Sequence, residues 1–127
     1  MKIIYDFGAH NGNDIPYYLT KADKVVAVEA NPGLAAQIKE RFKDEPKVVV
    51  EDCAVVINDE SVAYFYVHRD DVKSGLDPQE DSESYQQIKV PAKNVLDIIK
   101  THGAPYFIKI DVEFVDHLIL ELSLIHI

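Results

Sequence analysis

Three short apolar segments of this chain each end in a carboxylate. The segments read IIYD, VVAVE and FIKID, and their acids are Asp6, Glu29 and Asp111. In a parallel sheet the carboxyl ends of the strands meet at one edge, where ligands bind. Acids gathered at such an edge suit a ligand that carries hydroxyl groups and a positive charge, rather than one dominated by phosphates.

The first of these acids opens a glycine-containing turn, DFGAHNG, in which Gly8 and Gly12 stand four positions apart. Glycines let a turn approach a ligand closely, and the helix that follows offers backbone N–H groups. A dinucleotide site needs G-x-G-x-x-G, but His10 occupies the middle glycine position here. S-adenosylmethionine, a nucleoside without phosphates, fits better, with its ammonium near Asp6 and its carboxylate on the N–H groups of the turn.

Glu29 supports the nucleoside interpretation. It lies seventeen residues after Gly12, at the end of the second apolar segment. From that position a carboxylate accepts hydrogen bonds from both ribose hydroxyls. We therefore expect Glu29 to hold the ribose.

Asp111 is the candidate for orienting or deprotonating a methyl acceptor, with His10 and His117 as weaker alternatives. Asp111, Glu113 and His117 also raise the question of a metal, since the last two are i, i+4 neighbours on one helix face. No fourth ligand is visible in the sequence, so we expect no metal.

The elements that position these residues follow from hydrophobic periodicity and helix caps. Apolar runs predict strands, and amphipathic segments between them predict helices that begin at Asn13 or Asp14, at Asn31–Pro32, and at Asn94. The strands are expected at 2–6, 25–30 and 104–111 and in 47–56, where the strand passes into a loop, with an antiparallel pair at 61–68 and 86–92. This order predicts one α/β domain: a parallel sheet with helices on both faces.

The composition narrows the classes of partner. The 127 residues include 22 acidic and 13 basic side chains, a net charge of −9, which disfavours nucleic acid and anionic membranes. No segment approaches the ~20 apolar residues of a membrane span, so a cytoplasmic protein is expected. Cys53, the single cysteine, is expected to be a packed residue, and His68, His102 and His126 to be surface or terminal residues. The acidic stretch 70–83 is expected to be a solvated loop, with a substrate lid as the alternative.

Several blocks of the sequence together resemble one family. DFGAHNG, VVAVEANP, EDCAVV, VPAKNVLDII and YFIKIDVE, in this order and spacing, are similar to the FkbM-type class I SAM-dependent methyltransferases, over roughly residues 2–121. The resemblance implies a Rossmann-like methyltransferase fold, S-adenosylmethionine as cofactor, and O-methylation of a small-molecule or sugar hydroxyl. A non-catalytic nucleoside-binding fragment and an NAD-dependent oxidoreductase remain as alternatives.

The resemblance also implies roles for individual residues. Cofactor contacts are implied for residues after the first three strands: Asp6, Gly8, Ala9, His10 and Gly12, then Glu29 and Asn31, then Asp52, Cys53 and Ala54. The acidic motif beside the methyl-transfer site corresponds to Asp111 and Glu113. A small-residue loop that borders that site corresponds to Ser74, Gly75 and Leu76.

The chain departs from the family at its end. Phe114 stands where the family has glycine, and a full methyltransferase sheet has further strands after the fourth. The last residues, LSLIHI (122–127), lose the pattern, so we expect a partial domain whose native sequence ends near Glu121. Without a fifth strand, the fourth (106–110) becomes an exposed edge, which predicts self-association.

Overall fold

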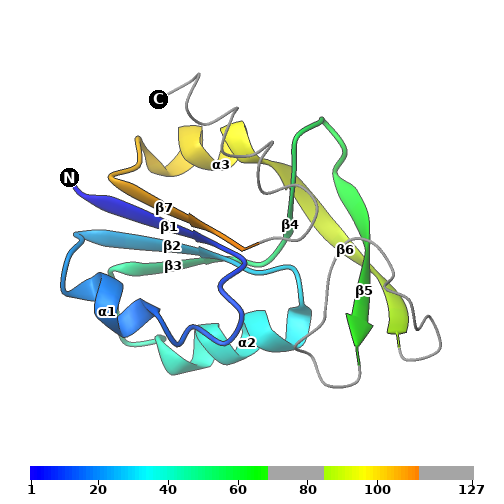
Figure 1. Cartoon of the computed structure of the whole chain (residues 1–127), viewed down its shortest axis with the longest axis horizontal. Coiled ribbons are helices and arrows are strands. Elements are labelled where there is room, and N and C mark those ends of the chain that lie inside the picture. The colour runs from blue at the N-terminus through cyan, green and yellow to red at the C-terminus, as the bar shows by residue number, and fades with distance from the viewer. Residues whose placement is uncertain (69–84, 112–127) are drawn as a thin grey trace.

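Four parallel strands form the central sheet of this computed structural model, which describes residues 1–68 and 85–111 (Figure 1). The strand order is β3-β2-β1-β7, and the expected Rossmann-like α/β fold is confirmed. The strands are β1 (Ile3–Phe7), β2 (Lys24–Val28), β3 (Val48–Glu51) and β7 (Phe107–Ile110).

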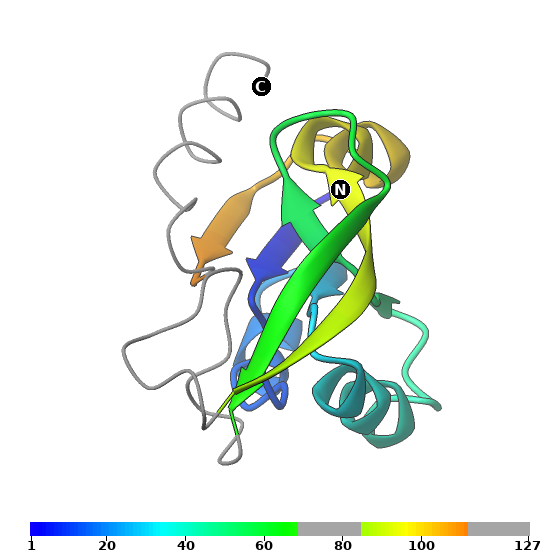
Figure 2. The same cartoon turned by 90° about the vertical axis from the view of Figure 1, so that its right-hand side faces the viewer.

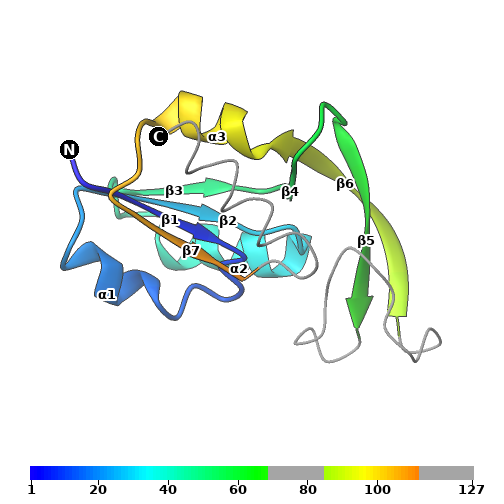
Figure 3. The ribbon, with the colours of Figure 1, turned by 45° about the horizontal axis from the view of Figure 1, so that its top comes forward.

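Helices cover both faces of this sheet. The helices α1 (Ile15–Leu19) and α2 (Pro32–Arg41) lie on one face, and α3 (Val95–His102) lies on the other (Figures 1 and 3). The helices α2 and α3 both begin at an asparagine cap. The Asn31 side chain accepts hydrogen bonds from the N–H groups of Gly33 and Leu34, and the Asn94 side chain accepts one from Leu96.

Successive side chains of β1 point to opposite faces of the central sheet, so each face has its own part of the hydrophobic core. Ile3, Tyr5 and Phe7 pack in a cluster with Val95 and Ile98 of α3. Ile4 packs on the opposite face, in a cluster that includes side chains of α1 and α2. Asp6 has the same parity as Ile4 and lies on that second face.

A second sheet stands beyond the carboxyl ends of the parallel strands (Figures 2 and 3). It comprises β4 (Ala54–Val56), β6 (Tyr85–Asn94) and β5 (Val62–His68), in that order. The strands β5 and β6 pair antiparallel from Val62 opposite Pro91 to His68 opposite Tyr85. The predicted pairing of 61–68 with 86–92 is confirmed.

The prediction of a strand that passes into a loop over 47–56 needs correction in its second half, because Ala54–Val56 form a separate strand. The apolar run divides at Asp52–Cys53, so that β3 joins the central sheet and β4 pairs with β6 in the second. The physical reason is burial on two sides: Cys53 and Val55 enter the core beneath α3, whereas Ala54 packs against the second sheet. Among the described helices, none is both long and apolar enough to cross a membrane.

Candidate functional site

Asp6 lies at the carboxyl edge of the central sheet and is completely buried. Neither of its carboxylate oxygens has a hydrogen-bond partner among residues 1–68 and 85–111. Burial raises the pKa of Asp6 to about 6, against the opposing effect of Lys109, and the acids Asp14, Glu29 and Asp111 raise it further. A buried carboxylate without a hydrogen-bond partner is costly, and a cationic ligand would satisfy it.

The glycine turn after β1 is built from left-handed backbone. Gly8 and Gly12 have φ angles of 84° and 80°, and His10 has a φ of 58°, which is uncommon for a residue with a side chain. The N–H groups of Gly8 and Ala9 both donate to the carbonyl of Val28 on the neighbouring strand. The turn is thereby fixed against the end of β2.

Glu29 joins this turn to the start of α2. Its Oε1 accepts a hydrogen bond from the N–H of His10 at 2.7 Å, and its Oε2 accepts one from the N–H of Asn31 at 2.8 Å. Burial raises the pKa of Glu29, although the hydrogen bonds from Asn31 and His10 oppose that effect. Each carboxylate oxygen has a further lone pair, so these bonds leave acceptor capacity for ribose hydroxyls.

Two details of the expected turn need correction. The N–H groups of Gly8, Ala9, His10 and Gly12 all donate within the protein, so they are not available to hold a ligand carboxylate as expected. Gly12 also faces the protein rather than open space: a Cβ there would lie 3.2 Å from Ile15 Cδ1 and 3.3 Å from both Ile38 and Phe42. This glycine lets the turn pack closely against α2, and its cofactor contact stays a prediction.

Asn31 adds a donor beside Asp6 and Glu29. Its side chain is 4% exposed, and its Oδ1 is occupied in capping α2. The cap fixes the orientation of the amide, and Nδ2 has no partner in the described part of the chain. The carboxyl edge therefore holds two acceptors, the oxygens of Asp6, and one donor, Asn31 Nδ2, that lack a hydrogen bond in the described part of the chain. Such groups are expected at a site for a polar ligand.

Asp111 lies at the same edge, immediately after β7. Its backbone N–H donates to the carbonyl of Phe7 at 2.8 Å, which ties it to the end of β1, and its side chain is exposed. The structure thus gathers the three acids that end the predicted strands, Asp6, Glu29 and Asp111, at one edge.

The three residues that follow β3 differ in their burial and in their contacts. Asp52 is exposed and forms an ion pair with Lys39 at 3.2 Å. Cys53 is buried, and burial raises the pKa of its thiol to about 11, in agreement with the expected packing role. Ala54 is also buried. Their predicted contact with adenine is not tested by this geometry.

Other predicted site residues lie outside the described residues. These are Glu113, Phe114 and His117, the loop residues Ser74, Gly75 and Leu76, the whole acidic stretch 70–83, and the tail 122–127. Their predicted roles stay predictions.

Glu51, His102 and Lys93 form a charged cluster that the sequence analysis missed. His102 Nε2 lies 2.9 Å from Glu51 Oε1, Lys93 Nζ lies 2.6 Å from Glu51 Oε2, and Lys24 donates to His102 Nδ1. The expectation that His102 is a surface residue is wrong, because its side chain is only 9% exposed. Burial acts to raise the pKa of Glu51, but the hydrogen bonds from Lys93 and His102 outweigh it and lower the pKa.

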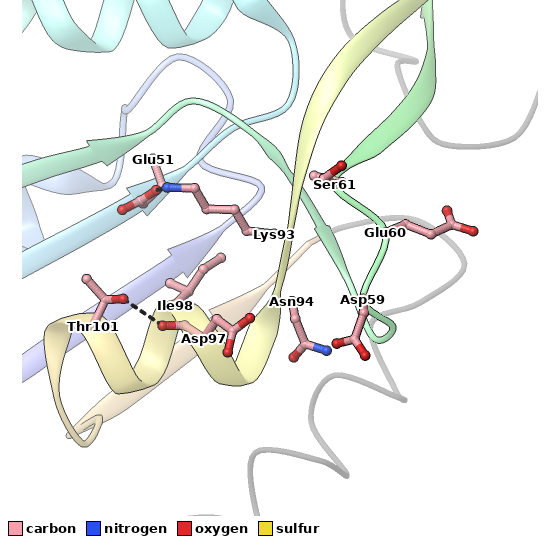
Figure 4. A pocket seen from close by; sticks show the side chains of 10 residues that line it. Glu51, Asp59, Glu60, Ser61, Lys93, Asn94, Asp97, Ile98 and Thr101 are labelled. Atoms are coloured by element: carbon pink, nitrogen blue, oxygen red, sulfur yellow. Dashed lines mark hydrogen bonds and ion pairs between the residues drawn. The ribbon is translucent and has the colours of Figure 1, made fainter.

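This cluster borders a cavity of about 480 Å³ at the start of α3 (Figure 4). Carboxylates of Glu51, Asp59, Glu60 and Asp97 line it together with polar side chains. The Asn94 side chain, which also lines it, donates from Nδ2 to the carbonyl of Asn58. Glu51 extends from β3 toward the α3 face, opposite the face on which Asp6 lies, so the cavity is separate from the carboxyl-edge site.

A Rossmann-like sheet with a glycine turn after β1 and an acid after β2 is typical of α/β proteins that bind a nucleoside or nucleotide at the carboxyl edge of the sheet. The model of the methyltransferase FkbM domain matches residues 6–124, and the chain belongs to the FkbM methyltransferase family. Neither a curated protein nor a solved structure matches the chain significantly.

Proposed function

We propose that this methyltransferase uses S-adenosylmethionine to methylate a hydroxyl group of a small molecule or sugar. The observation that carries the cofactor assignment is the buried carboxylate of Asp6, which has no hydrogen-bond partner in the described part of the chain. It lies among further acids at the carboxyl edge, where a cation is favoured and a pyrophosphate is repelled. The hydroxyl acceptor follows from the likeness to the family.

The turn after β1 supports a nucleoside without phosphates over a dinucleotide. Four of its N–H groups donate within the protein, so they are not available to cradle a pyrophosphate. His10 also occupies the position at which a phosphate would approach the backbone. Both features favour S-adenosylmethionine over NAD.

Each residue of the edge has a distinct task in this proposal. When bound, S-adenosylmethionine supplies a methyl group already activated by its sulfonium. Asp6 binds the ammonium, Glu29 accepts from the ribose hydroxyls, and Asn31 donates from Nδ2 to an acceptor of the nucleoside. Asp111 orients the acceptor hydroxyl and takes up its proton, and the main contribution of the protein is to position the two reactants.

The experiment is transfer of a labelled methyl group from S-adenosylmethionine to a panel of sugars and small hydroxyl compounds. We expect a labelled product, and Asp111→Asn should lower kcat by about 10²–10⁴-fold while the affinity for S-adenosylhomocysteine is retained. Binding of S-adenosylhomocysteine without transfer to any acceptor would favour the non-catalytic module. Binding of NAD in its place would favour the oxidoreductase.

A further inference from the structure

Lys109 lies beside the buried carboxylate of Asp6, on the neighbouring strand. The register of β1 and β7 pairs the two residues directly, and both side chains lie on the face of α1. Lys109 Nζ is 3.9 Å from Asp6 Oδ1 and 2.6 Å from Asp14 Oδ2. The shorter contact is a hydrogen-bonded ion pair, whereas the longer one is beyond hydrogen-bond distance.

Asp14 binds Lys109 instead of capping its own helix. It is the N-cap residue of α1, a position where an aspartate side chain normally accepts a hydrogen bond from the helix. Asp14 makes no such side-chain cap bond, and its carboxylate binds Lys109. The ammonium is therefore fixed where its charge acts on Asp6 but does not occupy the Asp6 oxygens.

The other charged and titratable groups that face Asp6 all disfavour its ionisation or are neutral. Asp14 lies at the start of α1, Glu29 at the end of β2 and Asp111 at the end of β7. The hydroxyl of Tyr18 faces it from α1. Lys109 is the cation that opposes these acids and the effect of burial.

We propose that Lys109, held by Asp14, is a positioning residue that keeps Asp6 ionised while leaving both of its oxygens without a hydrogen bond, so that a cationic group of the ligand can pair with them. The identity of that ligand rests on the proposed function; the effect of Lys109 on Asp6 does not. With Lys109 present, burial raises the pKa of Asp6 to about 6. Removal of the lysine charge raises it further, so that Asp6 is protonated over more of the neutral range.

Carboxyl ¹³C NMR titration of Asp6 in the full chain tests this directly. We expect Lys109→Gln to move the titration midpoint upward by about one pH unit, and Lys109→Arg, which keeps the charge, to leave it near that of the wild type. Lys43→Gln is the matched control, because Lys43 pairs with Glu40 on the exposed side of the molecule. Lys109→Met replaces the glutamine variant if the latter unfolds. An unchanged midpoint in the folded variant would overturn the proposal.

Titration with S-adenosylhomocysteine at pH 6 and pH 8.5 provides the second readout. Lys109→Gln should bind up to about tenfold more weakly than the wild type at pH 6 and lose less at pH 8.5, since one pKa unit corresponds to a factor of ten. A uniform loss at both pH values would contradict the role in ionisation. If the wild type binds no S-adenosylhomocysteine, the proposed function fails, and the NMR midpoint still decides the role of Lys109.

Discussion

The charge of Asp6 lowers the stability of the folded chain at neutral pH. Its pKa rises from 3.8 to about 6 in the folded state, so the folded chain binds this proton more tightly than the unfolded chain. The contribution of Asp6 to stability is therefore most favourable below about pH 4, falls as the pH rises from about 4 to 6, and stays lower above that. The folded chain thus keeps the destabilising charge of Asp6 at the carboxyl edge, where a cationic ligand would compensate for it.

Asp6→Asn should separate stability from function. Because asparagine keeps the shape and removes the charge, we expect the variant to be about 2 kcal/mol more stable than the wild type at pH 8 and nearly equal to it at pH 4. Thermal unfolding at the two pH values measures this. The exposed Asp44 offers the control, and Asp44→Asn should change neither value. A less stable Asp6→Asn variant at pH 8 would show that the charge is compensated inside the chain.

Asn31 has two roles that one substitution can separate. Serine at position 31 retains an acceptor for the cap of α2 but lacks the orphaned Nδ2 donor. We expect Asn31→Ser to weaken S-adenosylhomocysteine binding about tenfold, the value of one hydrogen bond, with little change in Tm. Asn94→Ser makes the same change at the cap of α3 and should leave binding unaffected. Equal binding by both variants would remove Asn31 from the site.

At the scale of elements, the contact between the glycine turn and α2 depends on Gly12. A side chain there would be strained at a φ of 80° and would press on Ile15, Ile38 and Phe42. We expect Gly12→Ala to lower the free energy of unfolding by about 1–3 kcal/mol. Chemical denaturation provides the measurement.

Gly33→Ala is the matched control for that substitution. Gly33 lies within α2, and a Cβ there would meet only Asn31 Oδ1 at an ordinary 3.4 Å. Helix propensity then predicts a gain of up to about 1 kcal/mol. Equal effects of the two alanines would mean that the turn does not pack against α2 as described.

The positions of the acids could be predicted from sequence because apolar runs define where the parallel strands end. Asp6, Glu29 and Asp111 follow such runs, and the topology then brings them to one edge. The second strand within residues 47–56 could not be predicted, since nothing in the sequence shows that Ala54–Val56 pair with a different sheet. The burial of the His102 side chain could not be predicted either, because it depends on Glu51, which is 51 positions away in the chain.

The sequence also could not predict that the N–H groups of the turn donate hydrogen bonds within the protein. A glycine pattern indicates left-handed backbone but not where the N–H groups point. Here Val28 and Glu29 of the neighbouring segment accept from three of them, and the carbonyl of Ala9 accepts from that of Gly12. Sequence reasoning thus predicted which acids meet at the carboxyl edge, whereas the donors and acceptors that this edge offers required the structure.

At the scale of the whole molecule, β7 is the edge of the central sheet in the part of the chain that the structure describes. Phe107, its first residue, is 51% exposed, and its ring lies 6.3 Å from that of Tyr18. An apolar edge strand of this kind favours pairing with a second copy. Self-association through β7 remains our prediction.

Light scattering over a range of protein concentrations tests this pairing. We expect the wild type to increase in mass with concentration and Phe107→Lys to reduce that increase, since a charge at an edge strand opposes pairing. Tyr17→Lys is the control, because Tyr17 is similarly exposed but lies on α1. A wild type that stays monomeric at high concentration would contradict the prediction.

The central claim is that the carboxyl edge binds a cationic nucleoside through Asp6. Isothermal titration of the wild type and of Asp6→Asn with S-adenosylhomocysteine, and of the wild type with NAD, tests it most directly. We predict that S-adenosylhomocysteine binds the wild type, that its affinity falls at least about tenfold in Asp6→Asn, and that NAD does not bind. Equal affinity of the two proteins for S-adenosylhomocysteine, or a preference of the wild type for NAD, would contradict the account.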